Sequence, residues 1–227
     1  LAISETSKKN IARLYNISGN RITVNHPGVD FLEHGKNPDL GNYILYVGQM
    51  FPRRHAKETI LAFEKLITEH SNILKNVGMS ELKLVVIGPD KYPEPIIDSL
   101  MSKVNERLGR ETVIHNDYVS NEELAELYAG AKALVYISDR EAFGLPPMEA
   151  LSFGIPPVIA DNELGHELFG EYAFYVKNQD TDGIAKGIID ALTNSEKIQK
   201  IRNSGPEFVK KYNWKSFTDK FLKIIEK

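Results

Sequence analysis

Two carboxylates, Glu141 and Glu149, flank a Phe-Gly turn and two prolines in the stretch EAFGLPPMEALSFGIPPV, residues 141–158. Proline is preformed for the first helical turn and glycine often follows the last, so a short helix is predicted from Pro146 to just before Gly154. Glu149 is then expected in its first turn and Glu141 in the preceding loop. Glu149 can accept both hydroxyls of a ribose diol, whereas Glu141 can accept hydroxyls of a second sugar or face a developing positive charge.

The backbone between the two carboxylates suits an anion. The N–H groups of Phe143, Gly144 and Leu145 precede a predicted helix, where free N–H groups bind phosphate, and Gly144 permits close approach. The pattern fits a nucleoside diphosphate sugar. A second interpretation stays open, in which Glu149 only complements the helix dipole and Glu141 is a solvated loop residue.

Short apolar runs alternate with amphipathic helical stretches along the chain, a pattern typical of a parallel sheet wrapped by helices. The sequence therefore predicts a doubly wound α/β domain with a six-stranded parallel sheet and helices on both faces. The capping-box spacing of Ser120 and Glu123 predicts one helix start. In such a sheet, ligands bind beyond the carboxyl ends of the strands. The predicted strands are 44–48, 83–87, 112–115, 133–137, 156–160 and 173–176.

Residues 1–18 stand apart from this pattern. LAIS reads as a strand and ETSKKNIARLYN as a helix, and SGN then interrupts the helix. We interpret residues 1–18 as the tail of a preceding domain and residues 19–227 as the ligand-binding domain. The chain also opens on Leu1 rather than Met, which favours a fragment of a longer protein.

Composition excludes several classes of protein. The 28 Lys and Arg against 31 Asp and Glu give a net charge of -3, without the basic, aromatic-rich runs of a nucleic-acid surface. We expect no nucleic-acid partner. The absence of cysteine excludes thiolate sites and agrees with a cytoplasmic location. No apolar run approaches the ~20 residues of a membrane helix, no signal peptide opens the chain, and membrane contact is not evident.

No metal site is predicted. The triplet DTD at 180–182 has the form of a metal-binding acidic pair, but it precedes a helical stretch, where capping and compensation of the helix dipole explain both aspartates. The histidines lack ligand spacing and acidic companions; they are residues 26, 34, 55, 70, 115 and 166.

Glu141 and Glu149, with the residues around them, resemble the E-x7-E signature of retaining glycosyltransferase family 4, a GT-B family. Three further segments are similar to the family: ILYVGQMFPRRHAKETILAFEKL, NEELAELYAGAKALVYIS and KYNWKSFTDKFLKII. The resemblance covers nearly the whole chain. It implies the carboxy-terminal, Rossmann-like half of a GT-B enzyme, in which the first Glu meets the donor sugar and the second the ribose.

The resemblance also implies where the diphosphate is held. The family uses a Gly-Arg pair and a later Lys, and these positions fall on Gly48, Gln49 and Arg54. With Gln49 in place of Arg, the diphosphate is expected to rest on Arg54, with help from Arg53. We therefore interpret Glu141 and Arg54 as catalytic.

Loops that follow two further strands are candidates for the nucleobase. Gly88 and Tyr118 lie there, although turn chemistry explains both loops equally well. For His166 and Glu167, which fall where the family places a Glu at the next helix start, a helix-start role is preferred to catalysis.

The resulting hypothesis is a donor-binding domain that moves a hexose from a nucleoside diphosphate sugar to an acceptor hydroxyl with retention and without a metal cofactor. The segment GLPPMEA is most similar to mannosyltransferases, and this resemblance favours GDP-mannose over a UDP-hexose. The alternative is a non-catalytic nucleotide-sugar-binding module, which Gln49 would favour. A nicotinamide dehydrogenase is excluded because no G-x-G-x-x-G follows the first strand. The acceptor is expected on a missing amino-terminal domain, so these 227 residues alone are expected to transfer no sugar.

Overall fold

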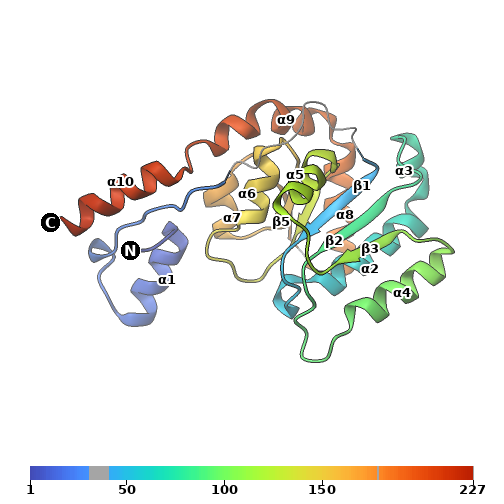
Figure 1. The fold of residues 1–227 in the computed structure, drawn as a ribbon, viewed down its shortest axis with the longest axis horizontal. Helices are drawn as coiled ribbons and strands as arrows, with labels where there is room; N and C mark the ends of the chain where they lie inside the picture. Colours follow the sequence, from blue (N-terminus) through green and yellow to red (C-terminus); the bar gives the residue numbers. More distant parts are fainter. Residues whose placement is uncertain (31–40, 178, 227) are drawn as a thin grey trace.

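The computed structural model describes residues 1–30, 41–177 and 179–226. Within these ranges the chain forms one six-stranded parallel sheet in the order β3-β2-β1-β4-β5-β6 (Figure 1). This confirms the predicted fold class, and each strand boundary falls within one residue of its prediction. The strands are β1 (Tyr43–Val47), β2 (Lys83–Ile87), β3 (Val113–Asn116), β4 (Leu134–Tyr136), β5 (Pro157–Ala160) and β6 (Phe174–Val176).

The helices start at polar caps where the sequence offers them. Ser120 and Glu123 form the predicted capping box at the start of α5. The Glu123 N–H donates to the Ser120 hydroxyl at 3.1 Å, and the Ser120 N–H donates to the Glu123 carboxylate at 2.8 Å. The helical elements are α1 (Glu5–Tyr15), η1 (Gly19–Arg21), η2 (Pro52–Arg54), α2 (Ala56–Glu69), α3 (Ser71–Asn76), α4 (Ile97–Leu108), α5 (Asn121–Gly130), α6 (Leu145–Ser152), α7 (Glu163–Phe169), α8 (Thr181–Thr193), α9 (Ser195–Val209) and α10 (Trp214–Ile225).

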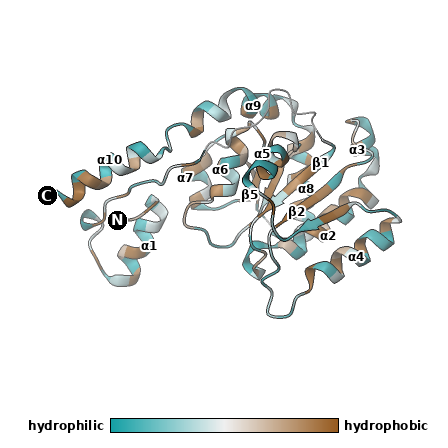
Figure 2. Cartoon of the chain, in the orientation of Figure 1, coloured by the Kyte–Doolittle hydropathy of each residue, from teal (hydrophilic) through white to brown (hydrophobic). Residues whose placement is uncertain are grey.

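The centre of the sheet is buried on both faces, because alternate side chains of β1, β2 and β4 enter different cores. In β1, Ile44 and Tyr46 join the larger core, to which α2, α4 and α8 contribute. Leu45 and Val47 join the smaller core on the other face, where α5 contributes Tyr128. Figure 2 shows the result as continuous hydrophobic colour along β1 and alternating colours along the helices.

The strand order places a crevice at the middle of the sheet. β1 pairs with β2 on one side and with β4 on the other, so the chain runs outward in opposite directions from this pair. In open parallel sheets such a reversal leaves a crevice beyond the carboxyl ends of the two strands, and ligands bind there. Gly48 follows β1 directly, and Glu141 lies in the loop that follows β4.

The amino-terminal segment differs from its prediction. The predicted strand LAIS is wrong: only Ala2 pairs, in an isolated bridge with Val24, because Ser4 already caps α1. The predicted helix is present as α1. Ala2, Ile22 and Val24 form a small apolar cluster apart from the two sheet cores. α1 and α10 lie at the same end of the molecule, together with both termini (Figure 1).

α10 and the end of α1 leave apolar side chains exposed. Leu14 is 73% exposed and Ile225 is 60% exposed. Across the described ranges, no helix combines the length and the apolar character needed to span a membrane.

A test of the sheet's central packing concerns Gly88, which follows β2. Its φ of +126° favours glycine, and a Cβ there would lie 2.4 Å from the carbonyl oxygen of Gly48. Gly88→Ala should lower the free energy of unfolding by about 2–4 kcal/mol, since backbone strain and overpacking add. Urea unfolding measures this change.

Gly78→Ala is the matched control. Gly78 also has a positive φ, +73°, but no atom lies within 4 Å of the position of a Cβ. Its substitution should cost only the ~1 kcal/mol of backbone strain. Equal losses in the two variants would show that the approach of Gly88 to Gly48 does not limit stability.

Candidate functional site

An ion pair between Arg54 and Glu141 joins the two loops at the crevice. Arg54 ends η2, which follows β1, and its Nε donates to Glu141 Oε1 over 2.8 Å. The two side chains are 17% and 19% exposed. Nη1 of Arg54 also donates to the backbone carbonyl of Gln49 at 3.3 Å. Of the predicted residues, Gly48, Gln49, Arg54 and Glu141 are therefore brought together.

Two further donors hold the same carboxylate oxygen. The Tyr136 hydroxyl lies 3.0 Å and the Ser138 hydroxyl 3.1 Å from Glu141 Oε1. Burial, and then the charge of Glu141, raises the pKa of Tyr136, so the phenol stays protonated and acts as a donor. Among the described residues Oε2 of Glu141 accepts no hydrogen bond. One oxygen is thus fixed and the other is available to a ligand.

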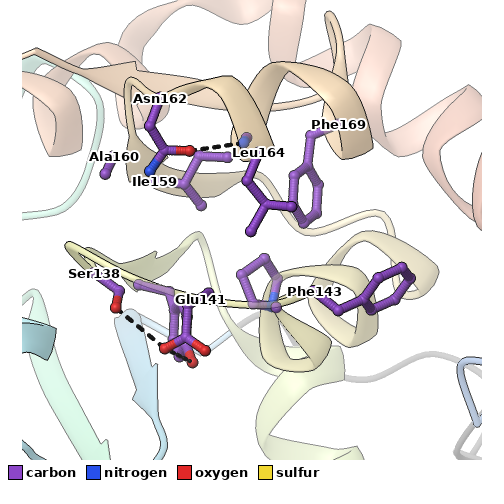
Figure 3. Close-up of a pocket in the computed structure, with 12 residues that line it drawn as sticks. Ser138, Glu141, Phe143, Ile159, Ala160, Asn162, Leu164 and Phe169 are labelled. Atoms are coloured by element: carbon purple, nitrogen blue, oxygen red, sulfur yellow. Dashed lines mark hydrogen bonds between the residues drawn. The ribbon is translucent and has the colours of Figure 1, made fainter. Parts of the chain in front are cut away.

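Glu141 lines a pocket between the loop after β4 and the loop after β5 (Figure 3). Figure 3 shows Ser138 and Glu141 on one wall, with Asn162, Leu164 and Phe169 across from them. The pocket is small, with a cavity volume of about 30 Å³. Asn162 Oδ1 accepts the Gly165 N–H at 2.8 Å and so caps α7, which occupies this oxygen but not the side-chain amide nitrogen.

The helix α6 begins at Leu145, one residue before the predicted start, and Gly144 has a φ of +89°. Within the described residues the N–H groups of Phe143, Gly144 and Leu145 donate no hydrogen bond, as expected for a helix start followed by two prolines. The Phe143 side chain, in contrast, is buried and packs edge-on against Tyr212. Only the backbone of Phe143 is available to an anion.

Glu149 does not occupy the predicted first turn of α6. The helix contains no acidic residue in its first turn, because Glu149 is its fifth residue. The helix begins one residue before the first of its two prolines, because proline is tolerated in the first turn of a helix. The side chain instead reaches α5, where the Tyr128 hydroxyl donates to Oε2 at 2.8 Å. This position removes the simple explanation that Glu149 complements the helix dipole.

The environment of Glu149 is costly for a charge. Burial raises its pKa, the hydrogen bond from Tyr128 partly offsets this, and the charge of Asp30 adds to it. Glu149 does not line the pocket that contains Glu141. The two carboxylates therefore have separate surroundings, one held by an arginine and the other by a buried tyrosine.

The remaining predicted residues follow the strands β1, β2 and β3. Arg53 is exposed, with its guanidinium 4.5 Å from the centre of the Phe51 ring. Gln49 is exposed, and within the described chain its side chain makes no hydrogen bond. Gly88 receives a hydrogen bond on its carbonyl from His115 Nε2 at 2.8 Å, and Tyr118, beyond β3, is 83% exposed.

Two acidic residues that the sequence analysis set aside have structural partners. Asp180 caps α8 by accepting the Gly183 N–H at 2.7 Å, as predicted, and the neighbouring Asp182 pairs with Lys65 at 2.6 Å. In the parts of the chain that are described, no three His, Cys, Asp or Glu side chains are grouped so that they could hold a metal. His34 lies outside the described residues.

Glu167 has a helix-start role, but for a different helix than predicted. It is the fifth residue of α7, and its carboxylate accepts the N–H groups of Glu5 and Thr6, at 2.6 and 2.8 Å, at the start of α1. These hydrogen bonds lower the pKa of Glu167 against the opposing effect of burial. Ser4, fully buried, donates to the carbonyl of Ala142 at 3.1 Å and so ties α1 to the loop that carries Glu141.

The raised pKa of Glu149 leads to a stability test. A carboxyl whose pKa is raised by folding stabilises the fold below its ordinary pKa, and this contribution is lost as the pH rises through the raised value. Glu149→Gln removes the charge and keeps an acceptor for Tyr128, so it should increase the free energy of unfolding at pH 7 by roughly 0.5–1 kcal/mol. Urea unfolding from pH 4 to 8 should show the gain shrinking toward pH 4.

The control is Glu126→Gln, at an exposed position of α5. It should change stability little at any pH. A Glu149→Gln protein less stable than the parent at pH 7 would contradict a net cost of the buried charge.

Curated relatives of known class align over most of the chain. It is 27% identical to the O-antigen chain mannosyltransferase RfbU of Salmonella typhimurium over 94% of the chain and 55% of that protein. It is 30% identical to the serotype-specific mannosyltransferase WbdA of Escherichia coli, over 80% of the chain and 20% of that protein. The chain thus spans about half the length, or less, of these relatives.

A solved structure shares the fold. The Anabaena Alr3699/HepE structure in complex with UDP-glucose matches with a TM-score of 0.79 at 14% identity, over 99% of this chain and 62% of that one. The sequence model of the family described as glycosyl transferases group 1 matches residues 31–208. This match covers more than half of the chain and includes the crevice with Arg54, Glu141 and Glu149. The chain therefore belongs to the glycosyl transferases group 1, as a domain with the fold of one half of a GT-B enzyme.

Proposed function

We propose that this domain binds a nucleoside diphosphate sugar and presents its hexose for transfer, with retention, to an acceptor hydroxyl. The observation that carries the proposal is the pair Arg54 and Glu141, fixed side by side at the strand-order reversal. A cation for a leaving diphosphate and a carboxylate for the sugar are the two charges that this reaction requires close together. Both are held before any ligand arrives.

Arg54 retains donors for the diphosphate. A guanidinium has five N–H groups, of which one is bound to Glu141 and one to the Gln49 carbonyl. The others can form charge-assisted hydrogen bonds to phosphate oxygens. The free N–H groups of Gly144 and Leu145 at the start of α6 add a second set of donors, so we expect the diphosphate between η2 and α6.

Glu149 is proposed to bind the ribose. A half-buried carboxylate with one tyrosine donor gains from further hydrogen bonds, and the two hydroxyls of a ribose supply them. The nucleobase is proposed to lie beyond β2 and β3, near Gly88 and Tyr118. Glu141, by its separate surroundings, is assigned to the sugar rather than to the nucleotide.

The proposed donor is GDP-mannose. RfbU and WbdA, to which the chain is similar, are named as mannosyltransferases. The complex with UDP-glucose in the Alr3699/HepE structure makes UDP-hexoses the second choice. We further propose that the domain acts in the cytoplasm, in keeping with a chain that contains no cysteine.

The acceptor is proposed to bind to a preceding domain, of which residues 1–18 form the end. The exposed apolar side chains of α1 and α10 are consistent with such a neighbour, because surface of this kind usually marks an interface. In this proposal, the domain alone binds the donor but transfers no sugar, since positioning of the two reactants accounts for ~7–11 kcal/mol of barrier reduction.

Nucleotide binding without a metal is the first test. Isothermal titration with GDP, UDP and ADP, each with Mg²⁺ and with EDTA, should show selective binding of one diphosphate that EDTA does not abolish, because Arg54 and N–H groups neutralise the phosphates. Heat of binding that vanishes with EDTA would sink the assignment of these groups to the diphosphate.

The two glutamates should differ in the same titration. Glu149→Gln should weaken binding of the free diphosphate about 10- to 100-fold, since a hydrogen bond to a charged group contributes ~1.5–3 kcal/mol. Glu141→Gln should leave that affinity nearly unchanged, because a free diphosphate carries no sugar. Glu126→Gln again serves as the control, and an equal loss in both site variants would mean that Glu141 does not belong to the sugar.

A further inference from the structure

His55 holds a backbone conformation that favours glycine. Its φ and ψ are 48° and 34°, the left-handed region, at the junction of η2 and α2. Among the described residues that are not glycine, only Asn16 shares a positive φ. Asn16 ends α1, where asparagine is a common left-handed cap. A strained residue next to a binding loop indicates that its side chain has a task that glycine could not perform.

The imidazole of His55 is enclosed between two carboxylates from different elements. Nε2 lies 2.8 Å from Asp139 Oδ1 in the loop after β4, and Nδ1 lies 3.7 Å from Glu58 Oε2 on α2. That Glu58 oxygen is buried and has no hydrogen-bond partner. The His55 side chain is only 17% exposed. The contact thus connects the segment after β1 to the segment after β4 over 84 positions of sequence.

Three successive residues of the turn 53–55 reach the same loop. The carbonyl of Arg53 accepts the Asp139 N–H at 3.0 Å, the Arg54 guanidinium binds Glu141, and His55 binds Asp139. The second of these contacts, between Arg54 and Glu141, joins the two residues proposed to act on the donor, so a bound ligand competes for the hydrogen bonds of this pair. The contacts of Arg53 and His55 both involve Asp139, which does not line the pocket beside Glu141.

We propose that His55 and Asp139 are a positioning pair, which keeps the turn 52–55 in register with the loop 138–141 so that Arg54 and Glu141 stay in place when the donor binds. The inference rests on the proposed function, because it gives the pair its purpose. The left-handed backbone of His55 aims the imidazole at Asp139 while Arg54, one residue earlier, points at Glu141. Glycine at position 55 would relieve the backbone and release the loop.

The test compares His55→Gly with Asn16→Gly, which relieves the same backbone conformation away from the crevice, and with Asp139→Ala. Hydrogen exchange measures the backbone amides of residues 139–141 in the ligand-free protein, and calorimetry measures the affinity for GDP and UDP. We expect His55→Gly to speed exchange of these amides at least fivefold and to weaken diphosphate binding on the order of tenfold, as misplaced groups do.

The melting temperature separates positioning from stability. Because relief of strain offsets the lost contact, His55→Gly should melt within roughly 2 °C of the parent, or higher. Asn16→Gly should leave exchange and affinity unchanged. The double variant His55→Gly/Asp139→Ala should bind no more weakly than either single variant, since the two residues act through one contact.

Unchanged exchange of residues 139–141 in His55→Gly would overturn the proposal, and so would additive losses in the double variant. A parent protein that binds neither GDP nor UDP would overturn the proposed function instead. The exchange measurement needs no ligand, so it would still decide whether His55 and Asp139 hold the two segments together.

Discussion

The reversal of strand order between β1 and β4 determines where polar groups can lie in this domain. β1, β2 and β4, at the centre of the sheet, send side chains into cores on both faces, so most of their side chains are apolar. The polar groups are displaced to the ends of the strands. At the reversal, two such ends lie side by side while their chains depart in opposite directions, and Arg54 from one meets Glu141 from the other. The close approach of Gly88 to Gly48 completes the floor of this crevice.

The carboxylates of Glu141 and Glu149 differ in how well their surroundings stabilise a negative charge. Glu141 has three donors on one oxygen, which is the satisfaction that a half-buried carboxylate requires. Glu149 has a single donor and a pKa raised by burial. A charge kept under such conditions adds little to folding, and groups with perturbed pKa values gather at functional sites. The left-handed backbone of His55 is likewise an unfavourable conformation for a residue other than glycine. Structural cost is concentrated within a few residues of one crevice.

The strands and most helix starts follow from local sequence, which is why they could be predicted. Apolar runs bounded by turn residues place the strands within one residue, and the spacing of Ser120 and Glu123 places the start of α5. The strand LAIS could not be recognised as wrong, because a strand of this length depends on its pairing partner rather than on its own residues. The start of α6 differs from its prediction by one residue, which moves Glu149 from the fourth to the fifth residue of the helix, since two prolines allow more than one helix start.

Some of the site residues could likewise be predicted from the sequence and others could not. Glu141, Glu149 and Arg54 could be found because they lie in recognisable segments. Their partners could not, since Tyr128, Tyr136 and Ser138 look in sequence like ordinary members of a helix and a strand end. A tyrosine at the end of an apolar strand is the available signal, because its hydroxyl emerges where the core ends. The contact of His55 with Asp139 gives no such signal, because φ angles and contacts across 84 positions are properties of the folded chain.

The carboxylate of Glu167 gives the amino-terminal helix a mechanical connection to the crevice. Its oxygens bind two N–H groups and the Thr6 hydroxyl at the first turn of α1, while Ser4 holds the Ala142 carbonyl beside Glu141. A displacement of α1 along α7 therefore pulls directly on the peptide between Glu141 and Phe143. α1 is in this way tied by hydrogen bonds both to α7 and to the loop that carries Glu141.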